Sequence, residues 1–69
     1  MQKGLSFDVL RAGKKYRLIN FGDVYEFVIE DILGNSNFRL RDLNSLENYY
    51  MEELVRYGKG DDFEIREIN

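Results

Sequence analysis

The sequence contains no cysteine, no histidine and no threonine. Without Cys and His the chain cannot form disulfides or offer thiolate or imidazole ligands to a metal. The same absences remove the thiol nucleophile and the usual general base near neutral pH. A pair of carboxylates, as in glycosidases, needs a cleft, for which 69 residues leave little room. We therefore expect neither an enzyme nor a metal or cofactor site.

Long apolar runs are also missing from the chain. No basic-then-apolar segment opens it, and no run approaches the roughly 20 residues that cross a bilayer. The lack of Cys is compatible with a reducing compartment. These features predict a cytoplasmic protein without membrane contact.

Basic charge is scarce and unevenly distributed. The net charge is −3, which argues against a general electrostatic attraction to nucleic acid. Residues 1–20 carry five basic side chains and one acidic, a balance of +4, whereas the rest carries five basic and twelve acidic, a balance of −7. Such asymmetry indicates either a partner footprint or ordinary solvated surface.

A predicted β-hairpin over residues 15–33 is the clearest structural signal. Its two arms flank a tight turn at Phe21-Gly22-Asp23, and apolar side chains alternate with polar ones along both arms. A period of two places one set on a core face and the other in water. On the expected core face lie Tyr16, Leu18, Tyr25, Phe27 and Ile29. The alternation changes phase near Glu30 and Asp31, which predicts a bulge or bend there.

The remaining segments are shorter. We expect a strand or extended segment over residues 5–9 and strands over residues 38–43 and 63–68, separated by turn-forming clusters. Residues 46–50 are interpreted as a strand followed by one or two helical turns that end at Gly58. The alternative is a single helix over residues 45–57, begun by a capping pair of Asn44 and Glu47.

These elements predict one mainly β domain over residues 1–69, with residues 1–4 frayed and a partly open barrel of about five strands over residues 14–68. The alternative for residues 45–57 would give an α+β fold with a four-stranded sheet. The element order resembles the SH3-like small barrels, the architecture shared by SH3, Tudor and KOW-type modules. The chain lacks the Trp of peptide-binding SH3 domains and the basic charge of KOW-type modules.

Tyrosine is abundant, and Tyr is a residue expected at protein interfaces. The protein-contact candidates are Tyr49, Tyr50, Tyr57, Asp61 and Asp62. Tudor-like barrels gather aromatics and a carboxylate at one mouth to hold a cationic or methylated side chain. By that resemblance, the candidates for an aromatic cage are Phe21, Asp23, Tyr25 and Glu26.

A basic strip is the basis of a competing hypothesis. The nucleic-acid candidates are Lys14, Lys15, Arg17, Arg39 and Arg41, which with Tyr16 would line one face of a barrel. Arg39 and Arg41 are equally explained as cross-strand partners of Glu26 and Glu30.

The leading hypothesis is a non-catalytic module that mediates protein–protein interaction, with an unidentified protein or a second copy of itself as partner. The alternatives are binding of RNA or single-stranded nucleic acid through the basic strip, and a structural accessory subunit of a larger complex.

Overall fold

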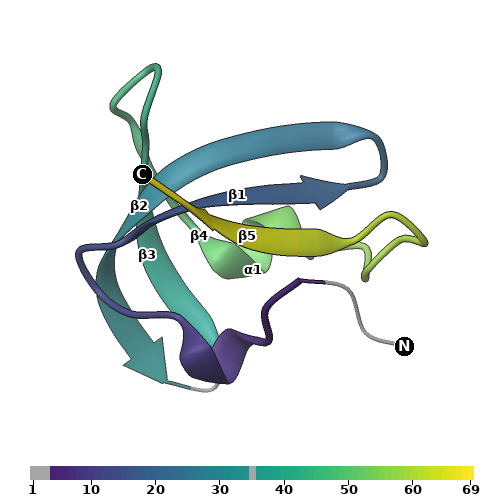
Figure 1. The fold of residues 1–69 in the computed structure, drawn as a ribbon, viewed down its shortest axis with the longest axis horizontal. Coiled ribbons are helices and arrows are strands. Elements are labelled where there is room, and N and C mark those ends of the chain that lie inside the picture. Colours follow the sequence, from purple (N-terminus) through teal and green to yellow (C-terminus); the bar gives the residue numbers. More distant parts are fainter. Residues whose placement is uncertain (1–3, 35) are drawn as a thin grey trace.

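The computed structural model describes residues 4–34 and 36–69. Its elements are a 3-10 turn η1 (Phe7–Val9), strands β1 (Lys15–Asn20), β2 (Asp23–Gly34), β3 (Asn37–Asp42) and β4 (Asn48–Tyr50), helix α1 (Met51–Leu54) and strand β5 (Glu64–Ile68). The strands form one antiparallel sheet in the order β4-β3-β2-β1-β5 (Figure 1). The predicted mainly β fold is therefore confirmed. Within the described residues the sheet stays open, with β4 and β5 at its two edges.

The β1–β2 hairpin forms where the alternation predicted it. Asn20 is paired with Asp23, so the connection is the two-residue turn of Phe21 and Gly22. Both turn residues have positive φ, 51° and 80° respectively. A turn of this kind matches the right-handed twist of the strands that it joins.

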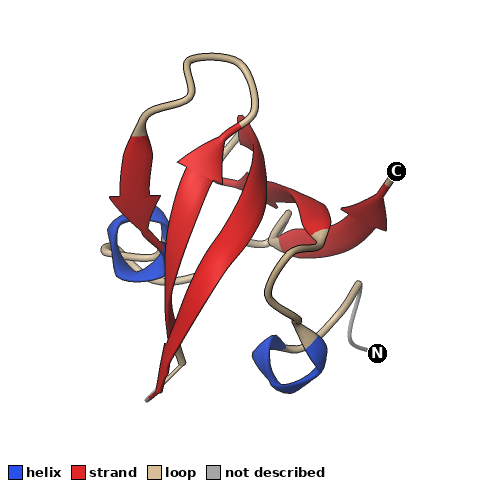
Figure 2. Cartoon of the chain, turned by 90° about the vertical axis from the view of Figure 1, so that its left-hand side faces the viewer, coloured by secondary structure: helices blue, strands red, loops and turns tan. Residues whose placement is uncertain are grey.

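A bend interrupts the β2–β3 pairing. The register shifts between Ile29 and Asp31 and again between Ile32 and Gly34, and the first shift confirms the bulge predicted near Glu30. Bulges increase local twist and bend a strand. Figure 2 shows the bent sheet: the long β2–β3 hairpin stands upright, while β5, which leads to the C-terminus, lies to one side of it and runs in a different direction.

Residues 46–57 form a short strand and one helical turn, so the single-helix alternative is wrong. Leu46 has a φ of 64°, a left-handed conformation outside the helical region. β4 begins at Asn48, two residues later than predicted, and pairs with β3. The capping pair of Asn44 and Glu47 does not form; the Tyr50 N–H instead donates to the Glu53 carboxylate at 2.9 Å, at the start of α1.

The amino-terminal segment differs from the predicted strand. Leu5 N–H donates to the Ile65 carbonyl at 2.8 Å, and the chain then coils into η1 instead of extending. The Phe7 ring lies edge-on to Phe38 and to Phe63, with centroid distances of 5.8 and 6.2 Å. Coiling turns Val9 outward and buries Leu10. Residues 1–3 of the predicted frayed start lie outside the described residues.

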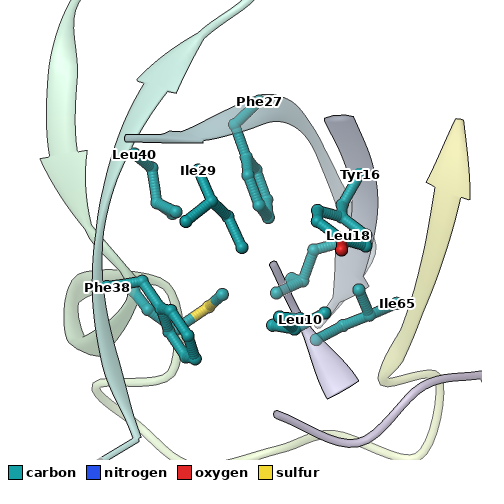
Figure 3. Close-up of a cluster of buried hydrophobic side chains, with 9 residues drawn as sticks. Leu10, Tyr16, Leu18, Phe27, Ile29, Phe38, Leu40 and Ile65 are labelled. Atoms are coloured by element: carbon teal, nitrogen blue, oxygen red, sulfur yellow. The ribbon is translucent and has the colours of Figure 1, made fainter. Parts of the chain in front are cut away.

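The core lies inside the curl of the sheet (Figure 3). It contains Leu10, Tyr16, Leu18, Phe27, Ile29, Phe38, Leu40, Met51 and Ile65. Tyr16 is 1% exposed, and its hydroxyl accepts a hydrogen bond from Arg11 N–H at 3.0 Å. Met51 contributes the only α1 side chain in this cluster. The side chains on one face of β1, β2 and β3 therefore pack in the core.

Candidate functional site

Two adjoining hollows lie beside α1. The larger, about 330 Å³, and the smaller, about 270 Å³, share Tyr25, Glu53 and Leu54 as lining residues. We call them together the aromatic groove. Its lining residues are Asn20, Phe21, Asp23, Tyr25, Asp42, Ser45, Glu47, Tyr49, Glu53, Leu54 and Tyr57. Four of these described residues are aromatic, four carry carboxylates, and none is basic.

The β1–β2 turn forms one end of the larger hollow. Asp62, from the loop before β5, accepts hydrogen bonds from Phe21 N–H at 2.9 Å and from Gly22 N–H at 2.8 Å. The Gly22 bond is the main cause that lowers the pKa of Asp62. Figure 1 shows this turn and this loop at the same end of the molecule. The Phe21 side chain is thereby held at the groove while remaining 57% exposed.

Asn20 holds the backbone around the larger hollow in place. Its side chain is 2% exposed, and its amide nitrogen donates to the Leu54 and Gly58 carbonyls, each at 3.0 Å. Its amide oxygen accepts from Gly60 N–H at 2.8 Å. A β-carbon on Gly60 would approach the Phe21 ring to 2.9 Å, so the loop backbone packs directly on that ring. One buried amide thus ties β1 to the end of α1 and to the following loop.

Two tyrosine–aspartate contacts organise the middle of the groove. The Tyr49 hydroxyl donates to Asp42 at 3.3 Å, and the Tyr25 hydroxyl lies 3.5 Å from Asp23. Burial, followed by the nearby aspartate charge, raises the pKa of both phenols. The backbone N–H of Ser45 is the main cause that lowers the pKa of Asp42. At neutral pH the groove therefore presents neutral phenols beside an ionised Asp42.

The structure brings together three of the four predicted cage residues. Phe21, Asp23 and Tyr25 line the larger hollow. Glu26 does not: it follows Tyr25 in β2, so its side chain lies on the other face of the sheet. There its carboxylate forms an ion pair with Arg17 at 2.7 Å. The structure therefore does not bring Glu26 together with the other three candidates, because consecutive strand residues alternate between faces.

The predicted protein-contact residues divide into three groups. Tyr49 and Tyr57 line the groove, on its smaller and larger hollow respectively. Tyr50 is 42% exposed and does not line either hollow. Asp61 is exposed in the loop before β5, whereas the Asp62 carboxylate accepts hydrogen bonds from the β1–β2 turn.

Six groove residues were not among the predicted site residues: Asn20, Asp42, Ser45, Glu47, Glu53 and Leu54. Asp42 had a usable signal, since it precedes the turn residues Asn44 and Ser45 and accepts both of their N–H groups, at 2.9 and 2.8 Å. Such local capping by Asp is a known turn feature. Glu47 was interpreted only as half of the capping pair with Asn44, and Glu53 and Leu54 only as part of the predicted helical turns.

The predicted basic strip lies largely on the opposite, solvent-facing side of the sheet. Arg41 forms an ion pair with Glu30 at 2.6 Å, and Arg39 with Glu30 at 3.6 Å and with Asp31. Lys14 lies 3.9 Å from Glu67, and Lys15 is exposed. The cross-strand partners expected for the arginines are thus correct for Glu30, while Glu26 pairs with Arg17 instead.

Within residues 4–34 and 36–69, no three acidic side chains converge as a group that could hold a metal ion. No helix of the described chain has the length and apolar character needed to span a bilayer.

No protein-family model, curated protein or solved structure matches this chain. The chemistry of the groove itself is therefore the basis for assigning a function.

Proposed function

We propose that this protein is a non-catalytic interaction module whose aromatic groove holds a Lys- or Arg-containing segment of a partner protein. The single observation that supports this function is the composition of the groove. Four aromatic side chains and four carboxylates line two adjoining hollows, with no basic residue among the described residues that line them.

This composition favours a cation over other ligands. Aromatic faces attract Lys and Arg by about 0.5–1 kcal/mol each at exposed sites, and by more when water is excluded. Carboxylates add charge-assisted hydrogen bonds, which are stronger than neutral ones. An anionic ligand would meet Asp23, Asp42, Glu47 and Glu53 without a compensating cation in the groove wall.

The groove is also preorganised. Asn20 and Asp62 hold its larger hollow through five hydrogen bonds of 2.8–3.0 Å to backbone groups. Binding to a site that is already ordered avoids part of the entropy cost of association. This supports a recognition role for the Phe21 turn.

The other hypotheses receive less support. The three arginines of the basic strip are paired with carboxylates on the sheet, so nucleic-acid binding stays a prediction that no observation here favours. Self-association and an accessory-subunit role likewise stay predictions.

The test is an NMR titration of the isotope-labelled protein with a blocked Gly/Ser peptide that carries one arginine. The reference is the same peptide with glutamine in place of the arginine. We expect the arginine peptide to shift the amide signals of Tyr25, Leu54 and Tyr57, with an affinity that falls as salt rises from about 0.05 to about 0.5 M. The Asp23→Asn and Glu53→Gln double variant should lose most of this binding.

The matched control is Glu26→Gln, which also removes a carboxylate charge but on the opposite face. Equal binding of the glutamine peptide would contradict the proposed function. So would shifts confined to the face that carries Arg17 and Arg39, or an equal loss of affinity in Glu26→Gln.

A further inference from the structure

The aromatic groove contains two hollows, not one. The larger is about 330 Å³ and the smaller about 270 Å³, and Tyr25 forms part of the wall of both. Sites for whole small ligands span about 300–1,000 Å³, and a single side chain needs only part of such a volume. Each hollow is thus large enough for one long side chain, and the Tyr25 side chain is common to the two.

Each hollow has its own charge and its own aromatic surface. The larger contains Asp23 with Phe21 and Tyr57, whereas the smaller contains Glu47 with Asp42 and Tyr49. Glu53 borders both. A ligand with a single cation could occupy only one of these sets at a time.

The carboxylates keep the capacity to accept further hydrogen bonds. Each ionised carboxylate offers about four lone-pair positions. The Glu47 carboxylate makes no hydrogen bond or ion pair to the described residues, and the Glu47 backbone N–H donates to the Ser45 hydroxyl at 3.2 Å. Glu53 accepts one N–H, from Tyr50. Both hollows can therefore bind a donor-rich side chain.

Resting on the proposed function, we propose that the groove recognises a dibasic segment. One Lys or Arg side chain enters the hollow of Asp23 and a second enters the hollow of Glu47, with the Tyr25 side chain between them. Because the hollows share a wall, both side chains must leave the same face of the bound segment. In an extended chain the nearest such positions are two residues apart, about 7 Å. The preferred pattern is thus basic-X-basic.

Three blocked Gly/Ser peptides test the pattern. One carries a single arginine, one carries two arginines separated by one residue, and one carries two adjacent arginines. We expect the separated pair to bind about ten-fold more tightly than the single arginine, because its second contact is intramolecular. The adjacent pair has the same charge but directs its side chains to opposite faces, so we expect only a two- to three-fold gain from it.

Two variants test whether the two arginines contact Asp23 and Glu47. Asp23→Asn and Glu47→Gln should each reduce the gain from the second arginine to about two-fold, whereas Glu26→Gln should leave it unchanged. Equal affinity of the separated and adjacent pairs, or an unchanged gain in Glu47→Gln, would overturn the dibasic proposal. If the single arginine binds in the groove and a second adds nothing, the proposed function stands and this inference fails. If no arginine peptide binds, both fail.

Discussion

Gly60 donates its backbone N–H to the side-chain oxygen of Asn20, 40 residues earlier, at 2.8 Å. The same Asn20 amide donates to the Leu54 and Gly58 carbonyls. It is the one buried polar residue among the described residues, at 2% exposure. The position of the loop that follows α1 thus depends on one side chain at the end of β1.

Replacing this amide should be costly. Asn20→Ala leaves two carbonyls and one N–H without their partner, and an unsatisfied buried group costs about 1–3 kcal/mol. We expect the free energy of unfolding, measured by urea denaturation, to fall by about 2–3 kcal/mol. Asn44→Ala removes an exposed amide at a turn and is the matched control, with an expected change within about 0.5 kcal/mol. Equal effects of the two substitutions would show that the hydrogen bonds of the Asn20 amide do not stabilise the fold.

Because of Asp62 and Asp42, the protein should lose stability as the pH falls into the acid range. Backbone N–H groups of Gly22 and Ser45 respectively are the main causes that lower the pKa of these two carboxyls from the ordinary 3.8. A pKa that is lower in the folded state adds stability above the unfolded value, and this is lost as pH falls through the folded value. The unfolding free energy should therefore decline below about pH 4.

Two single variants test whether Asp62 and Asp42 cause this loss of stability in acid. Asp62→Asn and Asp42→Asn should each be less stable than the original protein at neutral pH, and the difference should shrink towards about pH 2, where the carboxylates are protonated. Urea midpoints across this range provide the measurement. Asp8→Asn, in the exposed η1 turn, is the control. A stability difference that stays constant with pH would contradict this assignment of the two carboxylates.

Tyr49 and Tyr50 are neighbours in β4 with different roles. Tyr49 packs edge-on against Phe27, with ring centroids 6.5 Å apart, and its hydroxyl contacts Asp42. Tyr50 is 42% exposed. We expect Tyr49→Ser to lower the unfolding free energy by about 2–3 kcal/mol, somewhat less than for a fully buried aromatic. Tyr50→Ser should change it by less than about 1 kcal/mol.

Thermal and urea unfolding of the two tyrosine variants provide the measurement. The same variants bear on the interface prediction, because Tyr49 lines the groove and Tyr50 does not. Similar losses of stability in both variants would contradict the structure, in which the Tyr49 ring is packed and the Tyr50 ring is exposed.

The β1–β2 hairpin could be predicted because its signals are local. Alternation sets which side chains face the core, and the Phe21-Gly22 turn lies between the two alternating runs. The bulge near Glu30 was visible as a change of phase in the same alternation. Asn20, in contrast, looked like an ordinary polar residue at a strand end. Its burial follows from the path of residues 54–60, far away in the sequence.

Two expectations differ from the structure, for different reasons. Residues 5–9 alternate as a strand would, but Phe7 packs against Phe38 and Phe63 and the segment coils. Glu26 is adjacent in sequence to cage residues but faces away from them. Contacts with distant strands override the local pattern in the first case. In the second case the two-residue period of a strand already places Glu26 on the face opposite to Tyr25.

By itself the sequence determined the class of this protein: a small, mainly β domain without thiol or imidazole chemistry, built on a hairpin with a bulged second arm. Only the tertiary structure decided the site. Tyr25 lines one hollow with Tyr49 and the other with Tyr57, because the sheet bends and α1 returns beside the first hairpin, and Tyr25 and Tyr57 lie 32 positions apart in the sequence. Side-chain identity and spacing act over a few residues, whereas a groove arises from the register and curvature of the whole sheet.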